Sequence, residues 1–238
     1  MKIALLGYGR MGQTIERLAL DRGDQIVLKV DPQHDAITAL PSCGADVAID
    51  FSIPSVALDH ITACFEAGIP VVSGTTGWLE DFDLAIERCH QLDGGFIYGS
   101  NFSLGVNLFF ELNAKLAQLM KPFEHYKSSM IEVHHTRKLD APSGTAISLA
   151  DQIIGHSSKK SWTIEQSEEN DSDKLFIEVE REGDVPGTHV VNYDSSVDQI
   201  QIKHTAHNRD GFALGAVIAA HWLAGKTGVY TMRDVLNL

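Results

Sequence analysis

The chain has 238 residues, 44% of them hydrophobic, and a formal net charge of −13 at neutral pH. This length buries a sizeable core in one large or two modest domains, and the negative charge argues against nucleic acid as a partner. There is no apolar run of about eighteen residues and no signal-peptide pattern, so we expect no membrane partner and a cytoplasmic location. Cys43, Cys64 and Cys89 lack C-x-x-C spacing, which predicts free thiols and no metal site.

The first predicted element is a strand over residues 2–6, which ends in a glycine-rich turn over residues 7–12. Apolar residues at helical spacing, Ile15, Leu18 and Ala19, follow this turn. Glycines in a G-x-G-x-x-G turn between a strand and a helix let the backbone approach a pyrophosphate at the helix N-terminus. The pattern favours dinucleotide binding, and a purely structural glycine turn is the alternative.

A second strand over residues 25–30 ends in Asp31. An acidic residue at a strand end, about twenty positions beyond the glycines, is where a ribose hydroxyl is held. A carboxylate accepts from a free 2′-hydroxyl and repels a 2′-phosphate, and neither Pro32 nor Ile53 offers a compensating charge. NADH is therefore expected to serve at least as well as NADPH. Arg10 is the alternative, because its long side chain can reach a phosphate.

Strands and helices continue to alternate through the first half of the chain. We expect strands over residues 46–51, 70–74 and 95–98, and helices over residues 55–68 and 80–92. This succession predicts a Rossmann-like, doubly wound parallel sheet with ligands at the carboxyl ends of its strands.

Three loops fall at such strand ends and carry small or hydrogen-bonding residues that let a nicotinamide or ribose approach the backbone. The loop at residues 52–54 is equally well a plain turn. The other two loops supply candidate cofactor contacts: Gly74, Thr75, Thr76, Gly99, Ser100, Asn101 and Phe102.

The second half of the chain has a different texture. The pattern predicts helices over residues 106–120 and 144–156, a strand over residues 129–134, and three half-buried antiparallel strands over residues 175–181, 189–193 and 199–204. Residues 159–174 are polar, with an acidic run at 168–171, and are expected to form an exposed loop or a ragged sheet edge.

A closing helix over residues 212–223 is rich in Ala and Gly and is expected to pack back on the first domain. This makes the second, smaller α+β domain an insertion built on a mainly antiparallel sheet. The predicted ranges are 1–104 with 212–238 for dinucleotide binding, and 105–211 for substrate binding and oligomerisation.

The segment over residues 132–146 is the most informative part of the chain. His134 and His135 lie beside Lys138, and a Ser-Gly-Thr turn then opens an apolar helix. Histidine titrates near neutrality and can deliver a proton, while a lysine ammonium and the N–H groups of a helix start bind carboxylates. The segment predicts a site for a small acidic substrate, and a capped helix after a basic strand is the alternative.

These motifs resemble those of the 4-hydroxy-tetrahydrodipicolinate reductase family, also called dihydrodipicolinate reductases, of diaminopimelate and lysine biosynthesis. The most specific one is the Glu-x-His-His-x-x-Lys-x-Asp-Ala-Pro-Ser-Gly-Thr-Ala string at residues 132–146. Further matches lie at residues 9–12, 50–52, 74–77, 101–107, 181–189, 225–226 and 232–236. The resemblance implies that a hydride passes from a nicotinamide cofactor to a cyclic conjugated imine, with protonation by the enzyme.

The family pattern also implies roles for single residues. His134 is the expected proton donor and Lys138 the second catalytic residue, and His135, Gly144 and Thr145 are expected to bind a dicarboxylate substrate. The resemblance favours a homotetramer. Together with the loops named above, the expected cofactor contacts are Gly7, Tyr8, Gly9, Arg10, Met11, Gly12 and Asp31.

Two other functions are compatible with the first half of the chain. An amino-acid dehydrogenase would carry the same cofactor domain, and a non-catalytic redox sensor would bind a dinucleotide only to regulate a partner. The His134 to Ala146 string argues against the dehydrogenase. A sensor has no need for His134 and Lys138 together, so an assay of cofactor oxidation separates the sensor from the enzyme.

Overall fold

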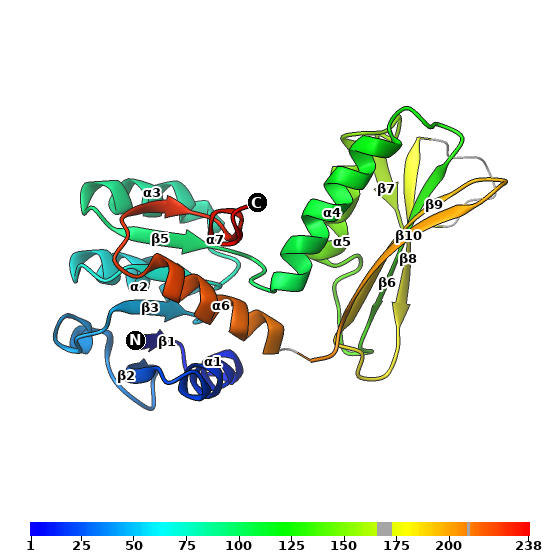
Figure 1. Ribbon diagram of the computed structural model, residues 1–238. Coiled ribbons are helices and arrows are strands. Elements are labelled where there is room, and N and C mark those ends of the chain that lie inside the picture. The colour runs from blue at the N-terminus through cyan, green and yellow to red at the C-terminus, as the bar shows by residue number, and fades with distance from the viewer. Residues whose placement is uncertain (166–172, 209) are drawn as a thin grey trace. The chain divides into compact units, whose positions relative to one another are not determined.

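The computed structural model describes residues 1–165, 173–208 and 210–238. These form two compact units (Figure 1): unit 1 is Met1–Asn107 with Asp210–Leu238, and unit 2 is Leu108–Arg209. Unit 2 is thus inserted between two parts of unit 1. We keep the sequence-based ranges, 1–104 with 212–238 and 105–211, as a proposal for the functional domains.

Unit 1 is built on a six-stranded sheet in the order β11-β5-β4-β3-β1-β2, and each pair of neighbours is parallel. Its strands are apolar on both faces, as strands covered on two sides must be. Their bounds are β1 Lys2–Leu6, β2 Gln25–Val30, β3 Val47–Asp50, β4 Val71–Ser73, β5 Gly95–Tyr98 and β11 Gly228–Tyr230.

Helices cover both faces of this sheet. One face packs against α1 (Arg10–Asp21), α6 (Asp210–Leu223) and α7 (Met232–Leu236). The other face packs against α2 (Pro54–Glu66), α3 (Phe82–Gln91) and the short 3-10 helix η1 (Ile37–Ser42). A second 3-10 turn, η2 (Leu79–Asp81), precedes α3. The predicted Rossmann-like doubly wound fold is confirmed, and the closing helix does pack on the first unit.

Unit 2 contains a five-stranded sheet in the order β10-β9-β6-β8-β7. The β10–β9 and β9–β6 pairs are antiparallel, whereas β6–β8 and β8–β7 are parallel. The sheet is therefore mixed, where the sequence predicted a mainly antiparallel one. The strands are β6 Lys127–His134, β7 Ser161–Thr163, β8 Lys174–Arg181, β9 Gly187–Asp194 and β10 Gln199–Ala206.

The reason for the parallel pairs is the crossover after β6. Helix α5 (Gly144–Ile154) follows β6 and returns the chain, so that the next two strands, β7 and β8, run in the direction of β6. Strand β7 lies inside the stretch 159–174, for which we expected an exposed loop or a ragged sheet edge, and it forms one edge of the second sheet. The acidic run at residues 168–171 lies outside the described residues.

Helices α4 (Leu104–Met120) and α5 pack on one face of the second sheet (Figure 1). Met130 of β6, Ile177 of β8 and Val191 of β9 all face this helical layer as part of its core. Because side chains alternate along a strand, the residues two and four positions from these face the helices as well. None of the helices in the described ranges is long and apolar enough to cross a bilayer.

Candidate active site

The glycine turn after β1 is shaped by close backbone contacts. Gly7 has φ +91°, and a Cβ there would lie 2.2 Å from the carbonyl oxygen of Phe51. A Cβ on Gly12 would lie 2.3 Å from the carbonyl oxygen of Gly7, so only glycine fits at these two positions. At Gly9 no described atom lies within 4 Å of the Cβ position, which leaves the turn open to a ligand.

This open position is also the start of helix α1. Gly9 is its N-cap, and no side chain in the described chain caps it. The first N–H groups of a helix have no partner within the helix, and together with the helix dipole they favour an anion. Three further predicted cofactor residues lie around this helix start. Arg10 is exposed, and Met11 is partly buried against the core. The Tyr8 hydroxyl donates a hydrogen bond to the Glu16 carboxylate.

Asp31 follows β2 at the edge of the same turn. Its Oδ1 accepts from the Gln33 N–H at 2.7 Å and lies 2.8 Å from Nδ1 of His34. The bond with His34 is the largest cause of the lowered pKa of Asp31. Because both contacts use Oδ1, the second oxygen of this carboxylate is the one that can accept from a ribose hydroxyl.

A buried carboxylate that we did not predict lies at the end of β3. Asp50 is fully buried, and its oxygens accept from the hydroxyls of Ser52 at 2.6 Å, Ser73 at 2.8 Å and Thr75 at 2.8 Å. The Thr75 hydroxyl also accepts from the Ser52 N–H at 2.8 Å. Thr75, a predicted cofactor contact, therefore turns its side chain toward the protein, whereas the neighbouring Thr76 is exposed.

The loop after β5 contacts the end of strand β4. The Gly99 N–H donates to the carbonyl of Ser73 at 3.1 Å, and Ser100 is exposed. Asn101 accepts at Oδ1 from the Ser103 N–H at 2.9 Å. The ring of Phe102 is 1% exposed and belongs to the core, so a ligand can reach this residue only through its backbone.

Hydrogen bonds and close approaches join the predicted cofactor loops at one edge of the sheet. The Gly7 N–H donates to the carbonyl of Val30, next to Asp31, at 2.8 Å. A Cβ on Gly74 would lie 2.2 Å from the ring of Phe51, whose carbonyl also adjoins Gly7. The crevice beside β1 and β3, where the strand order reverses, is the usual ligand position in such sheets.

The second group of predicted residues lies in unit 2, where three strands deliver polar side chains to the helical face. Glu132 and His134 follow Met130 along β6 at a spacing of two. In the sheet Glu132 pairs with His189 of β9, and His134 pairs with Arg181 of β8. All four side chains therefore meet under the start of α5.

Glu132 lies at the centre of this group and is fully buried. Its Oε2 accepts from the Ser143 N–H at 3.0 Å and the Ser143 hydroxyl at 2.5 Å, and its Oε1 accepts from Arg181 at 3.1 Å. Burial alone would raise the pKa of Glu132, but interactions with His189 and Ser143 outweigh it and lower the pKa to about 2. Glu132 is therefore a carboxylate at neutral pH.

His134 lies beside this carboxylate, with Nδ1 3.8 Å from Oε2 of Glu132. Its ring meets that of His189 edge to face at 5.1 Å between centroids. Burial, with the charges of His189, Lys138 and Arg181, lowers the pKa of His134 to about 4, against an opposing effect of Glu132. A Cβ on Gly187 would lie 3.1 Å from Nε2, so the glycine leaves room at this nitrogen.

Lys138 and the start of α5 complete the group. The Lys138 ammonium bonds Asp140 at 2.8 Å, and Arg181 donates to the carbonyl of Asp140 at 2.7 Å. Gly144 is the first residue of α5 and is exposed, with open space at its Cβ position among the described atoms. The two other predicted substrate residues, His135 and Thr145, are half-buried on either side of this loop.

Glu132, His134 and His189 have ligand atoms within 4.8 Å of one another and could converge on a metal ion. The carboxylate oxygens of Glu132 are, however, already hydrogen-bonded by Ser143 and Arg181. The chemistry of this set is therefore that of a hydrogen-bonded charge cluster.

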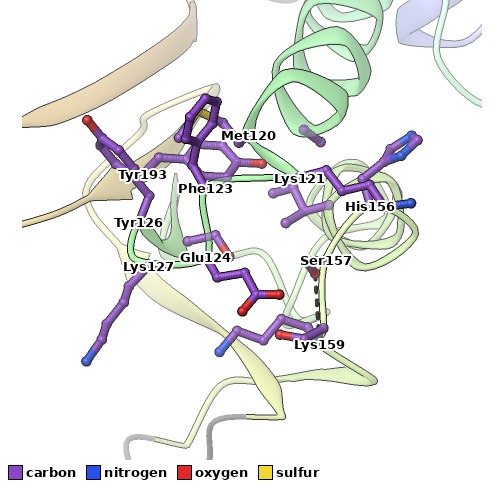
Figure 2. A pocket seen from close by; sticks show the side chains of 14 residues that line it. Met120, Lys121, Phe123, Glu124, Tyr126, Lys127, His156, Ser157, Lys159 and Tyr193 are labelled. Carbon is purple, nitrogen blue, oxygen red and sulfur yellow. Dashed lines mark hydrogen bonds between the residues drawn. The ribbon is translucent and has the colours of Figure 1, made fainter.

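A cavity of about 560 Å³ lies elsewhere in unit 2 (Figure 2). It is lined by residues at the start of β6, such as Lys127 and Ser128, and by residues that follow α5, such as His156. His134 ends β6 and Gly144 begins α5, so the cavity lies at the opposite end of both elements. It is separate from the cluster around Glu132.

Two family models cover nearly the whole chain. Residues 1–102 match the model described as dihydrodipicolinate reductase, N-terminus, and residues 105–236 match the model for its C-terminus. The chain is 56% identical over 241 residues to the 4-hydroxy-tetrahydrodipicolinate reductase of Christiangramia forsetii, covering 100% of this chain and 98% of the relative. It is 34% identical over 270 residues to that of Neisseria gonorrhoeae, with the same coverage.

These matches agree with the glycine-rich turn after β1 in unit 1. They identify the class of the protein, which is that of NAD(P)H-dependent oxidoreductases. The chain belongs to the dihydrodipicolinate reductase family, whose activity is the reduction of 4-hydroxy-tetrahydrodipicolinate in lysine and diaminopimelate biosynthesis.

Solved structures agree on the fold. A dipicolinate-bound dihydrodipicolinate reductase from Paenisporosarcina sp. TG-14 superposes with a TM-score of 0.78 at 22% identity, covering 98% of each chain. A probable dehydrogenase from Thermotoga maritima reaches a TM-score of 0.58 at 12% identity, covering 99% of this chain and 92% of its own. The predicted family and fold class are thus confirmed.

Proposed function

We propose that His134 and Lys138 carry out the proton chemistry of the reductase reaction in this chain, and that the start of α5 binds the substrate. The observation that supports this most directly is the cluster at the end of β6. There a histidine with restricted exposure, a lysine and an open helix N-terminus lie together around one buried carboxylate.

The residues of unit 1 fit a nicotinamide dinucleotide. The residues that would hold its pyrophosphate are Gly7, Gly9 and Gly12, with the N–H groups at the start of α1 as donors. Asp31 would accept from the ribose, and the loops at Gly74 and Gly99 would border the nicotinamide. When bound, the cofactor supplies the hydride.

The substrate carries two carboxylates, and unit 2 offers two places for them. One is the Lys138 ammonium, for which a substrate carboxylate would compete with the exposed Asp140. The other is the first turn of α5, with the N–H groups of Gly144 and Thr145, and we assign His135 as a further contact to the substrate. Charge-assisted contacts of this kind contribute about 1 to 3 kcal/mol each.

The lowered pKa of His134 sets the order of events. With a pKa of about 4, the imidazole is neutral at pH 7 before the substrate binds. Part of the lowering comes from the positive charges of Lys138 and Arg181, which a dicarboxylate offsets. We infer that substrate binding raises the pKa of His134, so that the imidazole gains a proton and then gives it to the reduced ring.

NADH is the proposed cofactor of choice. Asp31 is negatively charged at neutral pH, and its lowered pKa keeps it so. A 2′-phosphate placed against this carboxylate would be repelled, whereas the 2′-hydroxyl of NADH would be bound.

We propose a homotetramer assembled through unit 2. Helices α4 and α5 cover the face of the sheet that carries Met130, so Ile131 and Val133 point to the other face by alternation. Val190 pairs with Ile131 and with Lys203 across this face. In the described part of unit 2 no helix packs there, and a second sheet would cover it. Light scattering on the purified protein measures the assembly directly.

A cytoplasmic location is also proposed. The reaction consumes reduced nicotinamide cofactor, and Cys43, Cys64 and Cys89 are free thiols, which suits a reducing compartment.

The decisive experiment is an assay of the purified protein with enzymatically generated substrate. Oxidation of NADH, followed by absorbance, is expected only when the substrate is present. Binding of NADH without turnover would overturn the proposal and favour a dinucleotide sensor. Turnover with an amino acid or keto acid in place of the cyclic substrate would favour an amino-acid dehydrogenase.

A further inference from the structure

The Glu132 carboxylate connects more elements of unit 2 than any one of the expected catalytic residues does. It lies on β6 and accepts from Ser143 at the start of α5 and from Arg181 at the end of β8. On β9, Nε2 of His189 lies 3.7 Å from the same oxygen that Ser143 contacts. One buried charge thus holds a helix start and three strand ends together.

We propose that Glu132 is the positioning residue of the reductase reaction: it fixes the helix start that binds the substrate and supplies the negative charge that faces the proton-donating imidazole of His134. This inference rests on the function proposed above. It gives Glu132 two separable effects, one on substrate binding and one on proton delivery.

The first effect acts through Ser143. The Ser143 hydroxyl donates to Glu132 at 2.5 Å while its oxygen accepts from the Ala146 N–H at 3.2 Å, as an N-cap does. The Ser143 N–H is also taken up by Glu132, at 3.0 Å. Gly144 and Thr145 follow as the first two residues of α5, where backbone N–H groups have no partner within a helix, and we assign these N–H groups to an incoming carboxylate.

The second effect acts on His134. The charged and titratable groups that face this imidazole are Glu132 on β6, Lys138 and Asp140 on the following loop, Arg181 on β8 and His189 on β9. Lys138, Arg181 and His189 all disfavour an imidazolium, and Asp140 is exposed and paired with Lys138. Among the described residues, Glu132 is the buried group that favours the protonated donor.

Without this charge, His134 would be harder to protonate even with substrate bound. Burial and the positive charges of His189, Lys138 and Arg181 already lower the pKa of His134 to about 4. The negative charge of Glu132 acts against this lowering. Each further fall of the His134 pKa by one unit lowers the protonated fraction of the imidazole at neutral pH about tenfold. The charge of Glu132 is therefore needed for proton delivery, not only for packing.

The test compares Glu132→Gln, which keeps the size of the side chain and removes its charge, with Ser143→Ala, which keeps the charge and removes one link to the helix. For Glu132→Gln we expect kcat at pH 7 to fall about tenfold or more, a higher substrate KM, and a downward shift of the kcat pH profile by about one unit. For Ser143→Ala we expect a higher KM and an unshifted pH profile. Glu132→Asp should recover part of the lost kcat.

A matched control is Asp24→Asn in unit 1. Asp24 is also buried, and it pairs with the N-terminal ammonium at 3.1 Å and with His221 at 2.8 Å. Its loss should lower the melting temperature while the kcat pH profile stays unchanged. A Glu132→Gln variant that behaves like this control, losing stability but keeping its pH profile, would overturn the inference.

Nuclear magnetic resonance of labelled histidine gives a second measurement that does not depend on turnover. Dipicolinate is the probe, and it should raise the pKa of His134 in the unaltered protein and raise it less in Glu132→Gln, or in Glu132→Asp if the amide variant does not fold. Equal pKa values of His134 in both proteins would contradict the inference. Failure of the proposed function is distinct, because the unaltered protein would then not oxidise cofactor.

Discussion

Both units bury a carboxylate near the end of a strand, and the two have different surroundings. Asp50 in unit 1 is bonded by three neutral hydroxyls, with Nδ1 of His60 3.5 Å away. Glu132 in unit 2 is bonded by the Arg181 guanidinium and by Ser143, among two histidines and a lysine. The first network orders loops, and the second concentrates charge.

This difference follows from what each unit has to hold. A dinucleotide pyrophosphate is bound by backbone N–H groups, so unit 1 needs loops held in fixed positions rather than cations. A proton transfer needs side chains of tuned pKa, and charges in a buried setting tune them strongly. Substitutions in unit 2 should therefore change the chemical step, and substitutions in unit 1 should change cofactor binding.

The largest effect is expected from Lys138→Met, which keeps the stem of the side chain and removes its charge. If the ammonium binds a substrate carboxylate and favours negative charge on the ring, KM rises and kcat falls, with a combined loss of roughly 3 to 5 kcal/mol in transition-state stabilisation. Steady-state kinetics measure this. A melting curve should show a loss below about 0.5 kcal/mol, and near-normal kcat/KM would remove Lys138 from the site.

The next largest effect is expected from His134→Gln. Loss of the general acid should lower kcat by about a hundredfold or more with little change in cofactor KM. His135→Gln is the matched comparison, because the neighbouring imidazole should act mainly on the substrate KM. An unchanged kcat in His134→Gln would assign the proton to Lys138 or to water.

Asp50→Asn tests the other side of the comparison. The amide keeps the shape but loses an ionised acceptor for the hydroxyls of Ser73 and Thr75, so the unfolding free energy should drop by about 1 to 3 kcal/mol. The cofactor KM should rise severalfold because the loops after β3 and β4 lose their common anchor. The kcat pH profile should not move, and a shift would show that the two networks are not separate in function.

The smallest effect concerns the choice of cofactor. The ratio of kcat/KM for NADH over NADPH should be at least one, since Asp31 disfavours a 2′-phosphate. Replacement of Asp31 by Ser should move this ratio toward NADPH. A tenfold preference for NADPH in the unaltered protein would show that Arg10 or another cation outweighs Asp31.

The fold of unit 1 was largely readable in the sequence, because buried parallel strands are short apolar runs and the helices between them have regular spacing. The strands at residues 2–6, 25–30 and 95–98 were predicted to the residue. Strand β11 and helix α7 were not predicted, since three residues at a sheet edge carry too little pattern. The parallel pairing of β8 was missed because pairing partners are set by tertiary contacts.

The site was readable only in part. His134 and Lys138 stood out because their residue types are adjacent in the sequence. Glu132, Arg181 and His189 belonged to the family motifs, but nothing local told us that they meet. The available signal was alternation along the strands: Glu132 lies two residues after the buried Met130, and a carboxylate on a core-facing position needs partners from other strands.

The insertion of unit 2 has a consequence for how the protein is made. Helix α6 supplies Ala216, Val217 and Ala220 to one of the two cores of unit 1, and β11 closes the free edge of β5. Both elements follow residue 209, so the ribosome makes them only after the whole of unit 2. A nascent chain that has emerged only as far as β5 therefore lacks part of the cover on one face of the sheet, and the cofactor domain reaches its native packing only after unit 2 has been synthesised.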